Sequence, residues 1–248
     1  LEVAIEKAAV AMDVAPEWIQ ARNLIDDGYV FHYGQELEAC NMRRTWDEAM
    51  DHYEIDAIRK RIKTFNAENP YKKKGFAVMP VCFGISFTKT FLNQGSSLVH
   101  VYTDGSVSVA TGGIEMGQGV SSNMVAICAR VFGISADRVR WNSTNTTRIA
   151  NISPSAASAT SDLNGNATII ACREILSGMQ NVAAKELGCA PEAISLKDGV
   201  VLQNNAATEL TWETLVTNCY FSRVQLMAHG FYAPPNIHYN PAENYGRP

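Results

Sequence analysis

Apolar residues recur at helical spacing in the first part of the chain. The stretches 1–12 and 55–66 each place apolar side chains on one face of a helix. A third helix is predicted over 46–53, where Thr45 can cap the first turn and Glu48 stands at the reciprocal capping position. This part of the chain is therefore predicted to be mostly helical.

The pattern changes at residue 76. The segment 76–90 is rich in β-branched and aromatic residues and is predicted to form strand. In a strand, Phe83, Ile85 and Phe87 lie on one face, as in a sheet core. An aromatic followed by a hydroxyl, as in Phe87 and Thr88, can also form a stacking wall with a hydrogen-bonding neighbour for a flat ligand. Both interpretations of Phe87 stay open.

The rest of the chain alternates strands with helices. Asp-Gly pairs at 104–105 and 198–199 predict two hairpins, because glycine supplies the positive φ of a tight turn. The other elements predicted in this part are strands at 98–102, 107–109 and 138–142, a helix at 120–132, a long helix from Pro154 to Leu187, and a helix that Thr211 can cap and that runs to Asn218. The prediction is an α+β fold, with a helical piece at 1–75 and a mixed sheet-and-helix unit at 76–248.

Composition narrows the class of protein. With 248 residues, 46% of them hydrophobic, the chain can bury enough surface for one or two domains. A net charge of −4 gives no electrostatic footprint for nucleic acid. The six cysteines show neither zinc nor iron–sulfur spacing, so free thiols in a reducing compartment, the cytoplasm, are expected. No apolar run reaches the length of a membrane span, and a membrane partner is not expected.

Four glycines surround an acidic and an amide residue in the loop 112–119. A strand, a glycine loop and a helix start can cradle a polar ligand, because free amides of the first helical turn point outward. The loop lacks the Gly-Lys-Ser/Thr of a P-loop and the spacing of dinucleotide-binding folds. A tight connection without a ligand is an equally open interpretation. Glu115 is a candidate general base, although a single sequence shows neither a raised pKa nor a substrate within its reach.

The segment 153–162 consists almost entirely of small and hydroxylated residues. Ser153 and Pro154 suit the cap and first turn of the long helix. A first turn without bulk lets a ligand lie against the backbone amides, with hydroxyls available for anionic oxygens. Close helix packing is the alternative, since alanine and serine also serve that purpose.

Several segments, taken in their order along the chain, resemble the molybdenum-binding region of xanthine dehydrogenase and xanthine oxidase. The matching stretches are Phe-Gly-Ile-Ser-Phe-Thr at 83–88, Phe-Leu-Asn-Gln at 91–94, 99–107, Gly-Gly-Ile-Glu-Met-Gly-Gln-Gly at 112–119 and Ser-Pro-Ser-Ala-Ala-Ser at 153–158. The resemblance covers nearly the whole chain. It implies oxidative hydroxylation of a purine at a molybdenum held by molybdopterin, with electrons passing through iron–sulfur clusters to FAD.

The resemblance also implies roles by position. Phe87 would be one of two phenylalanines that sandwich the substrate, and Thr88 would hydrogen-bond it. The implied cofactor contacts are Gly113, Gly117, Gln118, Ala156, Ala157 and Ser158. Among these, Gln118 would contact the molybdenum–pterin group, and the two alanines would leave room beside it. No residue of the chain is expected to ligate the metal directly.

Other family features fall outside the chain. The family's glutamate base follows in a Gly-Glu-Pro-Pro-like motif, and the second stacking phenylalanine precedes Leu1. The chain begins inside a helix without an initiator Met, so we expect an internal fragment that is inactive alone. Ala233 stands where the family usually has Arg, and Ile114 where it often has Thr.

These departures leave alternatives open. An aldehyde oxidase or nicotinate-type hydroxylase of the same family is one, and a non-catalytic binding module on the same fold is another. The expected partners are iron–sulfur and FAD domains or subunits of the same enzyme, a small heterocyclic substrate, and a second copy in a dimeric assembly.

Overall fold

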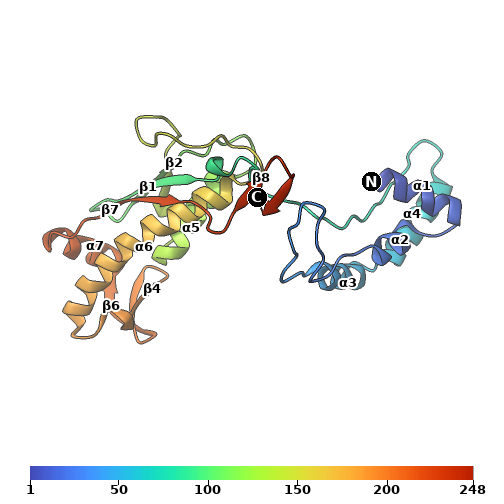
Figure 1. Ribbon diagram of the computed structural model, residues 1–248. Coiled ribbons are helices and arrows are strands. Elements are labelled where there is room, and N and C mark those ends of the chain that lie inside the picture. The colour runs from blue at the N-terminus through green and yellow to red at the C-terminus, as the bar shows by residue number, and fades with distance from the viewer. Residues whose placement is uncertain (248) are drawn as a thin grey trace. The chain divides into compact units, whose positions relative to one another are not determined.

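The computed structural model describes residues 1–247, which form two compact units. The first unit comprises residues 1–84 and 240–247, and the second comprises residues 85–239 (Figure 1). Helices dominate the first unit and sheets with helices the second, which confirms the predicted α+β class. The family resemblance implies that 1–75 is the end of a first molybdenum-binding subdomain and that 76–248 is the N-terminal part of a second, molybdopterin-binding one, and this assignment stays a prediction.

The helices of the first unit follow the predicted apolar pattern. They are α1 (Glu2–Met12), α2 (Pro16–Arg22), α3 (Met42–His52) and α4 (Ile55–Glu68). The predicted start of α3 was wrong, because the helix begins at Met42 and Thr45 lies inside it. The Thr45 hydroxyl donates to the carbonyl of Asn41 at 2.9 Å, the back-bonding geometry of an interior threonine.

Polar contacts organise the small interior of this unit. Arg59 forms an ion pair with the buried carboxylate of Glu17. The buried side chain of Gln20 donates from Nε2 to Glu2 and to the carbonyl of Val78, each at 2.8 Å. These contacts join α1, α2, α4 and the chain that follows them.

The second unit is built on a four-stranded sheet. Its strands are β1 (Gly95–Val101), β2 (Val107–Thr111), β3 (Val139–Trp141) and β7 (Met227–Tyr232), in the order β3-β2-β1-β7. The predicted hairpin is confirmed, with Val99 opposite Val109 and Gly105 at φ +80° in its turn. A second antiparallel sheet of this unit contains β4 (Ile194–Lys197), β5 (Val200–Gln203) and β6 (Ala206–Thr211). Near the end of the chain, β8 (His238–Asn240) and β9 (Tyr245–Arg247) form a separate two-stranded sheet.

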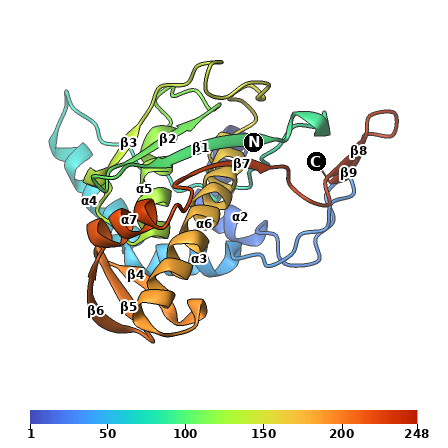
Figure 2. The same ribbon diagram turned by 90° about the vertical axis from the view of Figure 1, so that its left-hand side faces the viewer.

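Three helices complete the second unit, namely α5 (Val120–Phe132), α6 (Thr160–Leu187) and α7 (Trp212–Phe221), with short 3₁₀ turns at Thr90–Leu92, Ala136–Arg138 and Pro191–Ala193. Figure 2 shows α6 running alongside β1 and β7. The main core lies between the four-stranded sheet and these helices, and it includes Phe132, Met124 and Trp212, none of which is exposed. The Trp212 indole donates to the carbonyl of Gly105 at 2.8 Å, so α7 is fixed to the hairpin turn.

Two predictions for the segments around the second unit were wrong. The segment 76–90, which crosses from the first unit into the second, contains no strand, and Phe83 is 68% exposed rather than part of a core. Its side-chain composition favours strand, but it pairs with no neighbouring strand. The long helix begins at Thr160 instead of Pro154, because Ala157 and Ser158 adopt left-handed φ angles of 51° and 52°.

Within residues 1–247, none of the helices has the length and apolar character needed to cross a bilayer. All six cysteines are free thiols. The described residues include no cluster of His, Cys, Asp or Glu that could hold a metal ion.

Candidate functional site

The glycines of the loop 112–119 act in two ways. A Cβ atom on Gly112 would lie 2.3 Å from the side chain of Ile152, and one on Gly113 would lie 2.8 Å from Thr160. The first two glycines therefore allow close packing. Gly117 and Gly119 have φ angles of 99° and 82°, which residues with a Cβ atom rarely adopt. They turn the chain from β2 into α5.

The carboxylate of Glu115 folds back onto the start of α5. One oxygen accepts from the amides of Gly117 and Gly119 at 2.9 and 3.0 Å. The other accepts from the amide and the hydroxyl of Ser121 at 2.9 and 2.8 Å. These bonds, led by that from the Ser121 amide, lower the pKa of Glu115 to about 2. A carboxylate this acidic is a poor general base at neutral pH, which supports a structural role.

Gln118 is held inside the same loop. Its side-chain oxygen accepts from the amide of Met116 at 2.6 Å, and its Nε2 donates to the carbonyl of Ile114 at 2.8 Å. An amide side chain has two N–H donors and two acceptor lone pairs. One of each remains for a ligand after these two bonds.

The segment before α6 is strained. Ala157, Ser158 and also Ser86 have positive φ angles without being glycine. Each such residue costs roughly 1–2 kcal/mol, so surrounding contacts must hold it. Strained backbone often accompanies functional sites, and here three examples lie at one place.

Two hydrogen bonds join the three segments that the sequence singled out. The amide of Ile114 donates to the hydroxyl of Ser155 at 2.7 Å, which connects the glycine loop to the segment before α6. The amide of Ser86 donates to the carbonyl of Ala157 at 3.1 Å, which connects that segment to the neighbour of Phe87. Residues that are far apart in the sequence therefore meet at one edge of the second unit.

A pocket of about 420 Å³ opens between the glycine loop and the start of α6. Its lining residues are Met116, Gln118, Ser155, Ala156, Ala157, Ser158, Thr160 and Ser161. Of the predicted cofactor contacts, Gln118, Ala156, Ala157 and Ser158 line this pocket. Gly113 lies beside Thr160 behind the lining, and Gly117 shapes the loop without lining the pocket.

Phe87 and Thr88 are not part of the pocket lining. The backbone of Phe87 is held by Asn93, whose side-chain oxygen accepts from the Phe87 amide at 2.8 Å and whose Nδ2 donates to the Phe87 carbonyl at 2.9 Å. Asn93 is only 2% exposed. The ring of Phe87 is half-buried and Thr88 is exposed, so both remain accessible.

Thr160 and Ser161 were not predicted as site residues. They begin α6, which has no side-chain cap, and their amides and that of Asp162 make no hydrogen bond within residues 1–247. Asn123 donates to the Ser161 hydroxyl at 3.0 Å and so ties α5 to α6. The sequence shows both hydroxyls, but a helix predicted to begin at Pro154 places them in its second turn instead of at its N-terminus. Free amides at a helix N-terminus favour an anionic group.

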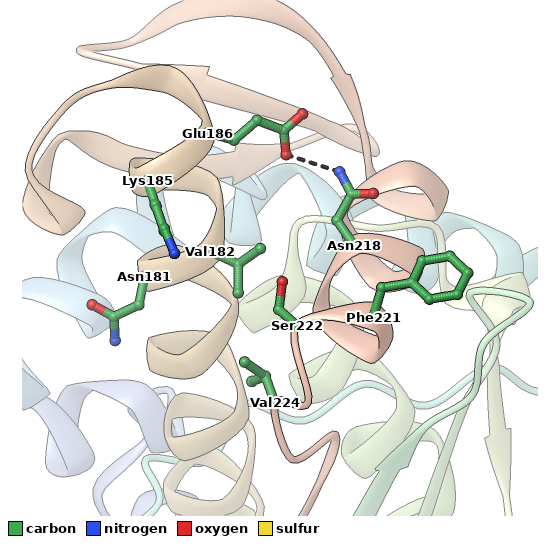
Figure 3. A pocket seen from close by; sticks show the side chains of 8 residues that line it. All are labelled: Asn181, Val182, Lys185, Glu186, Asn218, Phe221, Ser222 and Val224. Carbon is green, nitrogen blue, oxygen red and sulfur yellow. Dashed lines mark hydrogen bonds between the residues drawn. The ribbon is translucent and has the colours of Figure 1, made fainter.

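A larger hollow, of about 610 Å³, lies roughly 30 Å away, near the other end of α6. Its lining residues are Asn181, Val182, Lys185, Glu186, Asn218, Phe221, Ser222 and Val224 (Figure 3). Asn218 donates to Glu186 at 2.8 Å, the one hydrogen bond drawn there. The hollow contains none of the strained residues or predicted contacts, so size alone does not make it the better candidate.

The sequence profile described as "Molybdopterin cofactor-binding domain" matches residues 48–248. The chain belongs to this family. It is 37% identical over 244 residues to xanthine dehydrogenase/oxidase of Mus musculus, and the match covers 98% of the chain but 17% of that protein. Against xanthine dehydrogenase 1 of Arabidopsis thaliana, it is 38% identical over 94% of the chain and 16% of the relative.

Solved structures agree on the fold. Quinoline 2-oxidoreductase of Pseudomonas putida 86 superposes with a TM-score of 0.70 at 20% identity, covering 93% of this chain and 32% of that one. The chain is thus a molybdopterin-binding domain of the xanthine dehydrogenase family, as the resemblance predicted. It spans about 17% of the length of the relatives it matches.

The pocket residues fit the cofactor that gives the family its name. The volume lies within the range of small-molecule sites. Ala156 and Ala157 leave open space, and Gln118 retains a donor and an acceptor. The unpaired amides at the start of α6 suit an anionic oxygen, while at the start of α5 the Ser121 amide is already bound by Glu115.

Proposed function

We propose that the pocket between the glycine loop and the start of α6 holds the pterin-bound molybdenum group of a xanthine dehydrogenase-type enzyme. The observation that carries this proposal is the shared pocket itself. It brings Gln118 from one predicted segment beside Ala156, Ala157 and Ser158 from another, and the bond from Ile114 to Ser155 holds the two segments together.

Each side of the pocket has a distinct task in this proposal. Gln118 directs its remaining N–H toward the cofactor, because its other donor is bound to Ile114. The amides and hydroxyls of Thr160 and Ser161 stabilise anionic oxygens of the cofactor at the N-terminus of α6. Ala156 and Ala157 keep side-chain bulk away from the reacting centre. When bound, the cofactor supplies the oxygen transfer and accepts the electrons.

We infer that the substrate is a purine. Phe87 would stack against its ring, with Asn93 fixing the Phe87 backbone, and Thr88 would donate to a ring substituent or accept from it. The relatives that are 36–38% identical to the chain carry the name xanthine dehydrogenase, which favours a purine over an aldehyde. Iron–sulfur and FAD domains or subunits of the same enzyme would be the electron partners.

The catalytic base is proposed to come from another part of the complete enzyme. Glu115 is unsuited to this task because its carboxylate is fully engaged by four hydrogen bonds. The isolated chain of 248 residues is accordingly expected to show no xanthine oxidation. Turnover by the isolated chain with bound molybdenum would overturn this part of the proposal.

The cofactor assignment can be tested by filling the pocket in the complete enzyme that we infer this chain to belong to. Ala156→Leu places a large side chain in the pocket and is expected to abolish bound molybdenum, measured by plasma mass spectrometry. Ala190→Leu is the matched control, since Ala190 is an exposed alanine outside the pocket. Full molybdenum content in the Ala156→Leu enzyme would refute the assignment.

The substrate assignment needs a separate experiment. Thr88→Ala in the molybdenum-loaded enzyme is expected to raise KM for xanthine, while molybdenum content stays unchanged. Comparing purine and aldehyde turnover in the unmodified enzyme separates the two substrate classes. Faster turnover of aldehydes than of purines would replace the purine assignment with an aldehyde oxidase.

A further inference from the structure

Two helices begin beside the proposed cofactor pocket, and their N-termini differ. The start of α6 has unpaired amides at Thr160 and Ser161. The start of α5 carries an internal anion, since the carboxylate of Glu115 accepts from the amides of Gly117, Gly119 and Ser121. The start of α6 therefore has only unpaired amides, whereas Glu115 binds one first-turn amide of α5 and two amides of the loop before it.

The amides bound by Glu115 lie on both sides of Gln118. This residue lies between Gly117 and Gly119, whose amides are both bound by one oxygen of Glu115. The side chain of Gln118 then spans the loop from the amide of Met116 to the carbonyl of Ile114. The hydrogen bonds of Glu115 and those of Gln118 thus hold the same short turn, residues 114–119.

We propose that Glu115 is the positioning residue of the glycine loop, holding Gln118 toward the pocket by binding the amides of Gly117, Gly119 and Ser121. The inference rests on the proposed function for the meaning of Gln118 as a cofactor contact. Gly117 and Gly119 adopt positive φ angles. Without the carboxylate that binds their amides, both residues can change conformation easily, because glycine restricts the backbone least. The freed amides of α5 would also compete with α6 for an anionic group.

The test uses the full chain without cofactor, labelled with ¹⁵N. The first probe is the side-chain amide resonance of Gln118, and the second is hydrogen exchange at Gly117, Gly119 and Ser121. Glu115→Ala removes the acceptor, and added formate offers a small carboxylate to the vacated amides. Glu115→Gln keeps one acceptor oxygen and provides a milder variant.

Asp104→Asn is the matched control. Asp104 is another exposed carboxylate whose oxygen accepts from the amide and hydroxyl of a serine, Ser106, at 2.9 and 2.7 Å. It belongs to the β1–β2 turn and does not line the proposed pocket. Its replacement is expected to leave the Gln118 resonances unchanged.

In Glu115→Ala we expect exchange at the three amides to accelerate about tenfold or more, as for the opening of a local structure. The Gln118 side-chain resonances should move to free-amide positions, and formate should return them toward the wild-type positions. This rescue distinguishes positioning from general stability, because formate added to the wild type, where the Glu115 carboxylate still holds these amides, should leave the Gln118 resonances unchanged. If Glu115→Ala unfolds the second unit, Glu115→Gln must show the same Gln118 shift in weaker form.

The proposal fails if the Gln118 resonances stay in place in both variants, or if formate protects the backbone amides without restoring Gln118. In either case Glu115 would be a helix cap and nothing more. Since the measurement contains no cofactor, full molybdenum content in the pocket-filling experiment would count against the proposed function alone.

Discussion

The amide of Ile114 donates a 2.7 Å hydrogen bond to the hydroxyl of Ser155. The two residues are 41 positions apart, and the bond joins the glycine loop to the segment before α6. Both sides of the pocket are thereby held at a fixed separation. A loop built from glycine and a segment with strained backbone each depend on such external contacts.

Ser155→Ala is expected to weaken this connection. Losing one hydrogen bond costs about 1 kcal/mol, which corresponds to roughly fivefold faster exchange of the Ile114 amide. Hydrogen exchange of the full chain measures the effect. Ser153→Ala is the control, because the Ser153 hydroxyl makes no hydrogen bond within residues 1–247. Equal exchange at Ile114 in the two variants would show that Ser155 does not hold the loop.

The acidity of Glu115 predicts a pH-dependent contribution to stability. Its pKa falls from an ordinary value of 4.5 to about 2 in the folded protein, mainly through the bond from the Ser121 amide. A lowered folded-state pKa stabilises the protein above the unfolded pKa and loses that effect as the pH falls through the folded one. The contribution should therefore be complete at neutral pH and disappear between about pH 4.5 and pH 2.

Thermal unfolding of the wild type and Glu115→Gln across this range provides the measurement. The difference in Tm between them is expected to stay constant from neutral pH to about pH 5 and to shrink toward pH 2. Subtracting the variant removes the titration of other carboxylates. A difference that grows on acidification would contradict the assigned hydrogen bonds.

Local sequence signals predicted much of the fold. The Asp104-Gly105 turn, the hairpin around it and the cap at Thr211 depend on residues close in the chain, and all three are present. Gly133 and Gly188 end α5 and α6 in left-handed conformations, as a glycine after a helix predicts. Short-range chemistry decides these features, so one sequence is enough to find them.

The errors occurred where distant residues decide the backbone. Nothing near Pro154 signals that Ser155 binds Ile114 or that Ala157 binds Ser86, yet these contacts keep 155–158 out of α6. The sequence also did not predict the two hydrogen bonds between the Asn93 side chain and the Phe87 backbone. A single buried asparagine does not alter the hydrophobic pattern, so nothing in the sequence marks it. The pocket was anticipated through family resemblance, while its exact lining required the structure.

The cysteines are expected to differ sharply in reactivity. Cys82 is exposed, whereas Cys128, Cys172 and Cys219 are fully buried. A hydrogen bond with Cys128, together with burial, raises the pKa of Cys172 far above its usual range. The pKa of Cys219 is raised to about 11, mainly by burial and to a lesser extent by the negative charge of Glu186. Because the thiolate is the reactive form, these thiols should resist alkylation.

Peptide mapping after brief treatment with iodoacetamide at mildly alkaline pH tests this order. Cys82 should be modified first, and Cys172 only after denaturant is added. Modification of Cys172 in the native chain at the rate of Cys82 would mean that α5 and α6 separate readily.

The packing of β7 on α6 predicts a strong effect at Gly230. A Cβ atom there would lie 1.9 Å from the carbonyl oxygen of Ala167 and 2.9 Å from its carbonyl carbon. These are backbone atoms of α6, so relief requires the strand or the helix to move. Gly230→Ala is expected to destabilise the second unit by roughly 1–3 kcal/mol or more, the cost of overpacking a well-filled core.

Gly84→Ala separates this effect from the general cost of replacing a glycine. A Cβ atom on Gly84 meets nothing within 4 Å, and its φ is not in the left-handed region. Urea denaturation should give a near-wild-type midpoint for Gly84→Ala and a clearly lower one for Gly230→Ala. Since α6 also presents Thr160 and Ser161 to the pocket, a shift of α6 relative to β7 should reduce molybdenum binding in the complete enzyme as well. Equal midpoints for the two variants would show that β7 and α6 are packed less closely than this geometry requires.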